Sequence, residues 1–202
     1  MSPPYSPTIT TSRLTLRPLD FDTDIDFVYE LFKPEFDPLS TTEKPYTPQV
    51  VLHFLQNCQK RHKKVAPPHN SPFFYLVSTI STPQNPSEPV GLGLFYVRKA
   101  GLPGELAAYA LPQYHRKGYA KEAGIALIEE LKSKGVNEIC GTTSRSNVPS
   151  QKLMEALGFE QKGTVRMMGW GKAEGVELLG YVLPGMKGFE GDQIWSMTGE
   201  ED

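Results

Sequence analysis

The chain has 202 residues, of which 39% are hydrophobic and 22% charged, with a formal net charge of −2. This length suffices for one domain with its own core, and the composition is typical of a globular protein. A pI near 6.1 and the lack of a sustained Lys/Arg run argue against a nucleic-acid partner. No apolar run reaches the roughly 18 residues of a membrane span. The first residues also lack the charged and apolar regions of a signal peptide.

The cysteines and histidines give no sign of a metal site. Cys58 and Cys140 lie far apart without metal-ligand spacing, and each falls on a predicted apolar face. We therefore expect both to be buried, reduced thiols. The four histidines also lack ligand spacing, so no metal is expected. Together these features predict a cytoplasmic protein.

The first third of the chain predicts one strand followed by two helices. Residues 8–16 alternate like a strand with one buried face. Asp22 is the expected cap of a helix whose apolar residues recur at helical spacing, namely Ile25, Val28, Leu31 and Phe32. Thr47 and Pro48 supply the cap and first-turn proline of a second helix. Residues 62–72, rich in Pro, His and Asn, predict a loop.

The rest of the domain alternates strands and helices. Apolar and β-branched runs predict strands over residues 73–80, 90–97, 105–111 and 138–143, and a hairpin of residues 164–170 with 176–183. Helices are predicted over residues 119–134 and about 147–157. The order predicts an α+β domain over residues 8–183, with one parallel strand pair joined by the long helix. Residues 1–7 are an extension, and residues 184–202 a loosely ordered tail in which Trp195 is the candidate for docking.

The most informative stretch, residues 111–123, joins the fourth predicted strand to the long helix. A strand that passes through a polar turn into a helix directs free backbone N–H groups and the positive end of the helix dipole at one point. Such a point binds phosphate or pyrophosphate. Gly118 and Ala120 are small, which lets a ligand approach the backbone. By itself, Gly118 is equally explained as an ordinary turn glycine.

Two further segments extend this pattern. The strand over 138–143 is followed by NVPS at 147–150, which opens a helix ending in LGF at 157–159. With the turn, these segments resemble the acyl-CoA-binding half of the GNAT N-acetyltransferase superfamily. In that family a Gln/Arg-x-x-Gly-x-Gly/Ala turn binds the CoA pyrophosphate, and an Asn-x-x-Ser/Ala helix ending in Gly-Phe follows. The N-terminal TSRLTLRPL at 11–19 resembles the opening strand of the branch that includes ribosomal-protein alanine acetyltransferases.

The resemblance implies a fold and a co-substrate. The GNAT acyl-CoA N-acyltransferase fold is a mixed, mostly antiparallel seven-stranded sheet, splayed between strands four and five and flanked by helices. Acetyl-CoA would place its pantetheine arm in the splayed gap. The implied CoA contacts are backbone groups near Ala110 and Leu111, the main chain of Arg116, Lys117, Gly118, Tyr119, Ala120 and Lys121, and Asn147. The side chains of Arg116 and Lys117 either add charge at the phosphates or are solvated turn residues.

The sequence departs from the family pattern within the turn and at the general acid. His115 stands where Gln or Arg is usual, and Arg116 stands where many relatives carry Gly. Many GNAT enzymes carry a general-acid Tyr at the position of Met154, which we expect to pack in the core. The resembled branch lacks that Tyr, and there a Ser at the position of Ser150 is the candidate to protonate the thiolate. Asn147 and Ser150 are equally ordinary residues for a helix start.

The acceptor amine requires a pocket and, unless it is an α-amine or another less basic group, a dedicated base. A primary amine with a pKa near 10 must lose a proton before it attacks. Glu105, at the start of the fourth strand, is the candidate base, directly or through water; a surface carboxylate is the alternative. The acidic excess of residues 20–44 either attracts a cationic amine or serves helix capping and solubility. Phe36, Trp170 and Tyr181 are candidates to line the pocket, or else core residues.

The sequence thus predicts an acetyl-CoA-dependent N-acetyltransferase that moves an acetyl group to a primary amine by direct attack in a ternary complex. The acceptor is a small-molecule amine or a protein N-terminal or lysine amine. We expect a monomer or homodimer, with no nucleic-acid or membrane partner. The alternative is a CoA-binding module of the same fold without transfer. A different nucleotide site is disfavoured, because neither a three-glycine fingerprint nor a phosphate-loop lysine motif occurs.

Overall fold

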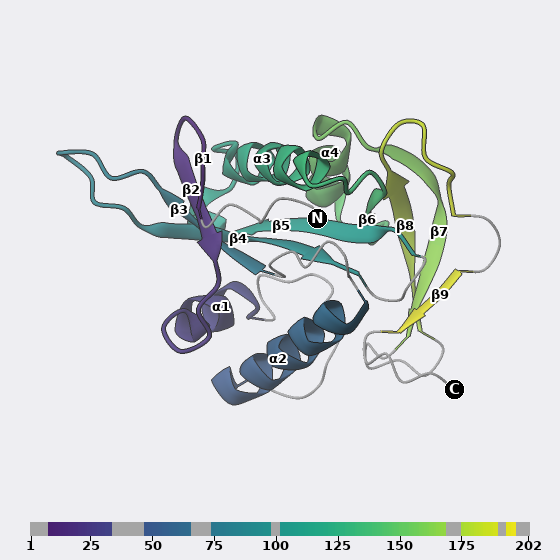
Figure 1. Ribbon diagram of the computed structural model, residues 1–202, viewed down its shortest axis with the longest axis horizontal. Coiled ribbons are helices and arrows are strands. Elements are labelled where there is room, and N and C mark those ends of the chain that lie inside the picture. The colour runs from purple at the N-terminus through teal and green to yellow at the C-terminus, as the bar shows by residue number, and fades with distance from the viewer. Residues whose placement is uncertain are drawn as a thin grey trace.

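The computed structural model describes residues 8–33, 47–65, 74–97, 102–168, 175–189 and 193–196. In these residues nine strands form one sheet in the order β1-β2-β3-β4-β5-β6-β8-β7-β9. Figure 1 shows α3 and α4 on one face of the sheet and α1 and α2 on the other. The domain is therefore a three-layer α+β structure, and the fold class is as predicted. The sheet has nine strands rather than the predicted seven.

The elements follow the predicted order. The helices are α1 (Ile25–Leu31), α2 (Pro48–Val65), α3 (Tyr119–Ser133) and α4 (Val148–Ala156), with a short 3-10 helix η1 (Pro112–Tyr114). The strands are β1 (Ile9–Thr10), β2 (Leu14–Pro18), β3 (Phe74–Thr79), β4 (Pro89–Tyr96), β5 (Gly104–Ala110), β6 (Ile139–Thr143), β7 (Glu160–Met168), β8 (Val176–Val182) and β9 (Gln193–Ser196).

Each face of the sheet has its own core. Leu127 of α3 and Met154 of α4 pack with Phe95 and Leu106 on one face. Leu55 of α2 packs with Leu92 and Tyr96 of β4 on the other. Neighbouring residues of β4 belong to opposite clusters because side chains alternate along a strand. The registers of β5 on β4 then place Glu105, opposite Tyr96, on the α1/α2 face.

The N-terminal segment differs from the single predicted strand. Residues 8–16 form β1 and the start of β2, which pair antiparallel with Ile9 opposite Leu16. Between them, the Thr11 N–H donates to the Leu14 carbonyl at 2.9 Å. The Thr11 side chain also accepts from the Leu14 N–H at 3.0 Å. These local hydrogen bonds close a tight turn and interrupt the alternating pattern.

Helix α1 begins after Asp24, not at the predicted cap Asp22. The Asp24 carboxylate receives both Arg17 guanidinium N–H groups at 2.7 Å and the Asp20 N–H at 2.8 Å. Burial acts to raise the pKa of Asp24, but the hydrogen bonds from Arg17 and Asp20 outweigh it and lower that pKa; the same pairing raises the pKa of Arg17. Asp24 therefore fastens β2 to the start of α1 instead of capping the helix with its side chain.

Two segments predicted as irregular are ordered by tertiary contacts. Residues 62–65 belong to α2, and the fully buried His62 accepts the Val97 N–H on Nδ1 at 3.3 Å. Residues 193–196 of the predicted tail form β9, which pairs parallel to β7. Trp195 is buried there, with its ring 5.5 Å from that of Phe189. The prediction of a loose tail is therefore wrong for this strand.

Candidate active site

The predicted phosphate turn lies between the end of β5 and the start of α3. Its first part is η1, after which Arg116 and Gly118 adopt left-handed φ values of 60° and 80°. Gly118 is also the residue that precedes the first turn of α3, and its carbonyl accepts the Glu122 N–H at 3.0 Å. Left-handed residues within a turn are typical of backbone concavities whose successive N–H groups bind an anion.

The backbone N–H groups of this turn are available for a ligand. In the described part of the chain, none of the amides from Arg116 to Lys121 has a hydrogen-bond acceptor. Those of Tyr119, Ala120 and Lys121 have none because they open the helix. The positive end of the α3 dipole adds to them, which makes this turn suited to bind an anionic group.

The two residues of the turn that depart from the family pattern, His115 and Arg116, affect its local structure. Arg116 holds a left-handed backbone without being glycine, which costs about 1–2 kcal/mol for an L-residue. His115 points back, and its Nε2 lies 2.9 Å from the Ala110 carbonyl. Because a carbonyl only accepts, Nε2 is the donor in this contact. The turn thus has two left-handed positions, one of them at a residue other than glycine.

Tyr114 and Lys117 pack against each other in the same turn. The Lys117 ammonium lies 5.0 Å from the centre of the Tyr114 ring. Partial burial and a hydrogen bond to Glu88 raise the pKa of the Tyr114 phenol. The Lys117 side chain is exposed.

Strands β5 and β6 separate soon after they meet. Their parallel pairing is limited to Gly104 with Ile139 and Glu105 with Cys140, although β5 continues to Ala110 and β6 to Thr143. This confirms the predicted splay. The Leu111 N–H donates to the Val90 carbonyl at 3.0 Å and is therefore used within the sheet. Because backbone groups alternate between the two sides of a strand, those of Ala110 and also Ala108 face the gap.

Glu105 lies at the closed end of this gap. It is buried, on the α1/α2 face, and accepts a hydrogen bond from the Thr142 hydroxyl of β6. It is therefore not the solvated surface carboxylate of the alternative interpretation. On the same face, the exposed ring of Tyr109 meets that of Phe32 at 5.3 Å. This face of the sheet therefore carries aromatic surface at Tyr109 and Phe32, with the Glu105 carboxylate buried on the same face.

Asn147 and Ser150 lie at the start of α4, just beyond the end of β6. The Asn147 side chain accepts the Ser150 N–H at 3.2 Å, which is an N-cap interaction. Asn147 is thus a helix-capping residue, which is the alternative to the CoA contact. Ser150 is half-buried, and its hydroxyl makes no hydrogen bond with the described residues. Both residues stay candidates for contact with a ligand in the gap.

Other candidates lie in the core. Met154 is 3% exposed and packs against Gly141 of β6, as expected of a core residue. Tyr181 is buried on the α3/α4 face, and burial, then Glu155, raise its pKa. It belongs to the core rather than to an acceptor pocket. Cys58 and Cys140 are buried, and neither forms a disulfide in the described part of the chain, as predicted. Phe36 and Trp170 lie outside the described residues, as does part of the acidic segment 20–44.

The comparisons with known proteins agree with this geometry. Residues 13–160 match the family described as the acetyltransferase (GNAT) domain, which is more than half of the chain. The chain belongs to the GNAT acetyltransferase family. Over 50 residues it is 36% identical to the ribosomal protein bS18-alanine N-acetyltransferase of Haemophilus ducreyi. That match covers 25% of this chain and 34% of the relative, and the curated relatives are matched over only about a third of their length.

Solved GNAT structures share the fold over nearly their whole length. A GNAT-family acetyltransferase of Bacillus anthracis superposes with a TM-score of 0.66 at 22% identity, covering 87% of this chain and 97% of the other. The ribosomal L7/L12 α-N-protein acetyltransferase RimL, solved with CoA, gives a TM-score of 0.63 at 14% identity, with coverages of 87% and 96%. At these identities the likeness shows the fold alone.

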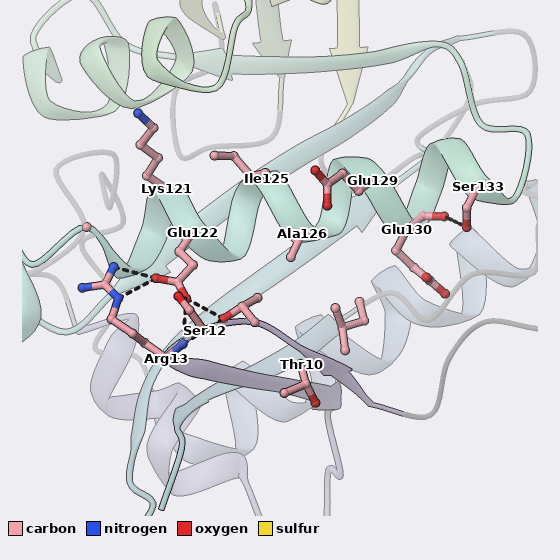
Figure 2. A pocket seen from close by; sticks show the side chains of 13 residues that line it. Thr10, Ser12, Arg13, Lys121, Glu122, Ile125, Ala126, Glu129, Glu130 and Ser133 are labelled. Carbon is pink, nitrogen blue, oxygen red and sulfur yellow. Dashed lines mark hydrogen bonds and ion pairs between the residues drawn. The ribbon is translucent and has the colours of Figure 1, made fainter.

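Figure 2 shows a second feature of this GNAT domain, a groove between the β1–β2 turn and α3. It meets the phosphate turn at Gly118 and Lys121 but contains neither Glu105 nor Asn147, so it is separate from the gap. At its end, Arg13 and Glu122 form an ion pair at 2.6 Å. Within the residues described, no cluster of potential metal ligands occurs, and no helix has the length and apolar character needed to cross a bilayer.

Sequence reasoning missed several residues around the site. Thr142, the partner of Glu105, carried no signal because a threonine in a strand is ordinary. Glu122 also went unnoticed, although its position in the first turn of α3 favours a negative charge there. The position of Ala108 at the gap follows from the alternation of backbone groups along β5 once the Leu111 N–H is known to point toward β4.

Proposed function

We propose that this GNAT protein transfers the acetyl group of acetyl-CoA to a primary amine by direct attack in a ternary complex. The observation that carries the proposal is the run of amides from Arg116 to Lys121, which have no acceptor among the described residues and follow the end of β5 that has separated from β6. An anion cradle beside a strand gap fits a diphosphate joined to an extended pantetheine arm. The CoA complex of a fold neighbour supports the same co-substrate.

Each candidate cofactor-binding residue then has a role along the path of acetyl-CoA. The turn amides hold the diphosphate, and the Ala110 N–H and the backbone of Ala108 bind the pantetheine arm, which runs toward Glu105; the Ala110 carbonyl is occupied by His115. Amides near the thioester carbonyl polarise it. Cations at Arg116 and Lys117, both exposed, add charge near the phosphates. Asn147 contributes a further contact from the start of α4.

The transfer requires two proton movements. The amine nitrogen bonds to the carbonyl carbon while the carbon–sulfur bond breaks. Glu105, directly or through water, takes the proton that the amine loses. Ser150 donates a proton to the departing thiolate and regains one from solvent. The acceptor enters from the α1/α2 face, where Glu105 and Tyr109 lie, and is a small-molecule amine or a protein N-terminal or lysine amine.

A CoA-binding protein without transfer is the second candidate function. It is favoured by one observation: the position of the family's usual general acid is occupied by Met154, which lies in the core. Such a protein would bind CoA through the same turn. It would not release free thiol from acetyl-CoA when amines are added.

Two assays test the proposal. Calorimetry with CoA and acetyl-CoA tests binding, and release of free thiol across a panel of amines and N-terminal peptides tests transfer. Turnover with at least one acceptor supports the enzyme. CoA binding without turnover on a broad panel supports the second candidate, and no binding at all contradicts both. Ser150→Ala should slow turnover more than it weakens binding; unchanged turnover would remove Ser150 from the mechanism.

A further inference from the structure

The N-terminal TSR motif meets the first turn of α3 at a single carboxylate. Glu122 Oε1 accepts the Thr11 hydroxyl at 2.5 Å, the Ser12 hydroxyl at 3.0 Å and the Arg13 N–H at 2.9 Å. Its Oε2 accepts Arg13 Nε at 2.6 Å. Figure 2 shows Ser12, Arg13 and Glu122 converging at the first turn of α3. We call Thr11, Ser12, Arg13 and Glu122 the N-terminal clamp.

The clamp continues into the phosphate turn through Arg13. Its Nη1 donates to the Lys117 carbonyl at 2.9 Å, and its guanidinium lies 5.0 Å from the centre of the Tyr119 ring. A Cβ on Gly118 would lie 3.3 Å from Arg13 Nη2. One side chain therefore touches the residues on both sides of Gly118 and passes close to Gly118 itself.

Arg13 adds to the contacts that hold the phosphate turn from within, namely Lys117 on the Tyr114 ring and His115 on the Ala110 carbonyl. Arg116 occupies a left-handed conformation without the freedom of glycine, so the turn is under local strain. The N–H groups from Arg116 to Lys121 make no hydrogen bond within the described residues. The Lys117 carbonyl, in contrast, is fixed by Arg13, and that fixes the peptide plane whose N–H belongs to Gly118.

We propose that the N-terminal clamp holds the phosphate turn in its CoA-binding shape, with Arg13 and Glu122 as positioning residues. The inference rests on the proposed function, because it assumes that the turn binds the CoA diphosphate. In this proposal the TSR motif acts through the phosphate turn and touches neither acetyl-CoA nor the acceptor. The Glu122 side chain is only 16% exposed and is saturated by donors, so its role is to organise its neighbours and not to bind ligand.

The competing explanation is that the ion pair only joins β2 to α3. The two explanations differ in which part of acetyl-CoA is affected. A clamp on the phosphate turn changes the binding of the diphosphate, whereas general loosening of the fold affects every donor. S-acetylpantetheine carries the same thioester and arm but no diphosphate, so it separates the two.

The experiment compares Glu122→Gln with a matched control on the same helix. Glu130→Gln removes an equal charge from α3 and an ion pair with Lys134 at 3.5 Å, but lies about two turns from Glu122 and about three from Gly118. We expect Glu122→Gln to weaken CoA binding by calorimetry roughly tenfold or more, the scale of one charge-assisted hydrogen bond. With the best acceptor of the wild-type panel, kcat/KM should fall with acetyl-CoA but not with S-acetylpantetheine. Glu130→Gln should leave CoA binding and the kcat/KM values with both donors unchanged.

The outcomes separate the clamp from the proposed function. If Glu122→Gln binds CoA as tightly as the wild type does, the clamp is overturned and the proposed function stands. The same conclusion follows if kcat/KM falls equally with acetyl-CoA and with S-acetylpantetheine. No CoA binding by the wild type overturns the proposed function instead. Should Glu122→Gln not fold, Arg13→Lys carries the test, because the half-exposed Arg13 tolerates this change while the contact with the Lys117 carbonyl is lost.

Discussion

Glycines at the two ends of α3 offer a direct test of the phosphate turn. Gly118 precedes the helix with φ 80°, and Gly135 follows it with φ 85°. Alanine at either position must adopt a left-handed backbone, at a cost of about 1–2 kcal/mol. A Cβ at Gly135 meets nothing within 4 Å, whereas one at Gly118 lies 3.3 Å from Arg13 Nη2. The two substitutions therefore cost similar backbone strain but differ in their surroundings.

Gly118→Ala should weaken CoA binding while Gly135→Ala should not. The methyl group or the relaxing backbone moves amides that point toward the diphosphate, and loss of one charge-assisted hydrogen bond corresponds to roughly ten- to hundredfold in affinity. Urea unfolding should show a loss of about 1–2 kcal/mol for each variant. Calorimetry with CoA then separates them. Equal weakening by both variants, or unchanged affinity in Gly118→Ala, would refute the placement of the diphosphate.

Three further predictions concern single residues. Arg116→Gly should leave stability unchanged or raise it by up to about 1 kcal/mol. Glycine relieves the left-handed strain but also gives the unfolded chain more conformational freedom, and the two effects oppose each other. CoA titration of this variant measures what the arginine side chain adds to binding. Met154→Ala should cost about 2–4 kcal/mol in urea unfolding as a cavity-forming change, and a kcat/KM per folded molecule below a tenth of the wild type would reinstate Met154 in the chemistry. Although burial opposes it, hydrogen bonds from Arg17 to Asp24 and from the clamp to Glu122 lower both carboxyl pKa values below their ordinary range near 4. Their stabilisation is therefore complete above that range and is lost as pH falls through the lowered values. Asp24→Asn should flatten the fall in stability below pH 5 and cost roughly 1–3 kcal/mol at pH 7, given that Arg17 is partly exposed; an acid profile identical to that of the wild type would contradict the pairing.

The sequence predicted what depends on local pattern. The helix over 119–134 ends one residue earlier, with Lys132 in its last turn and Gly135 just after it, since capping and periodicity act within a few residues. The turn at Gly118 was found for the same reason. The fold and the family were confirmed by the structure and by the GNAT match.

Features that depend on distant contacts were not predictable from pattern. The clamp joins Thr11 to Glu122 across 111 positions, and neither residue is unusual where it stands. His62 continues α2 because it meets Val97 in the core, although its local composition favours a loop. β9 needs the edge of β7 to pair with. The roles of Glu105, Ser150 and Asn147 stay predictions.

Backbone amide NMR tests the central claim most directly. If the turn binds the diphosphate of CoA, titration with CoA should shift the N–H resonances from Arg116 to Lys121 together. The amides near Gly135 at the far end of α3 should stay unchanged. Saturable binding of CoA that leaves the signals of the turn in place would contradict the account.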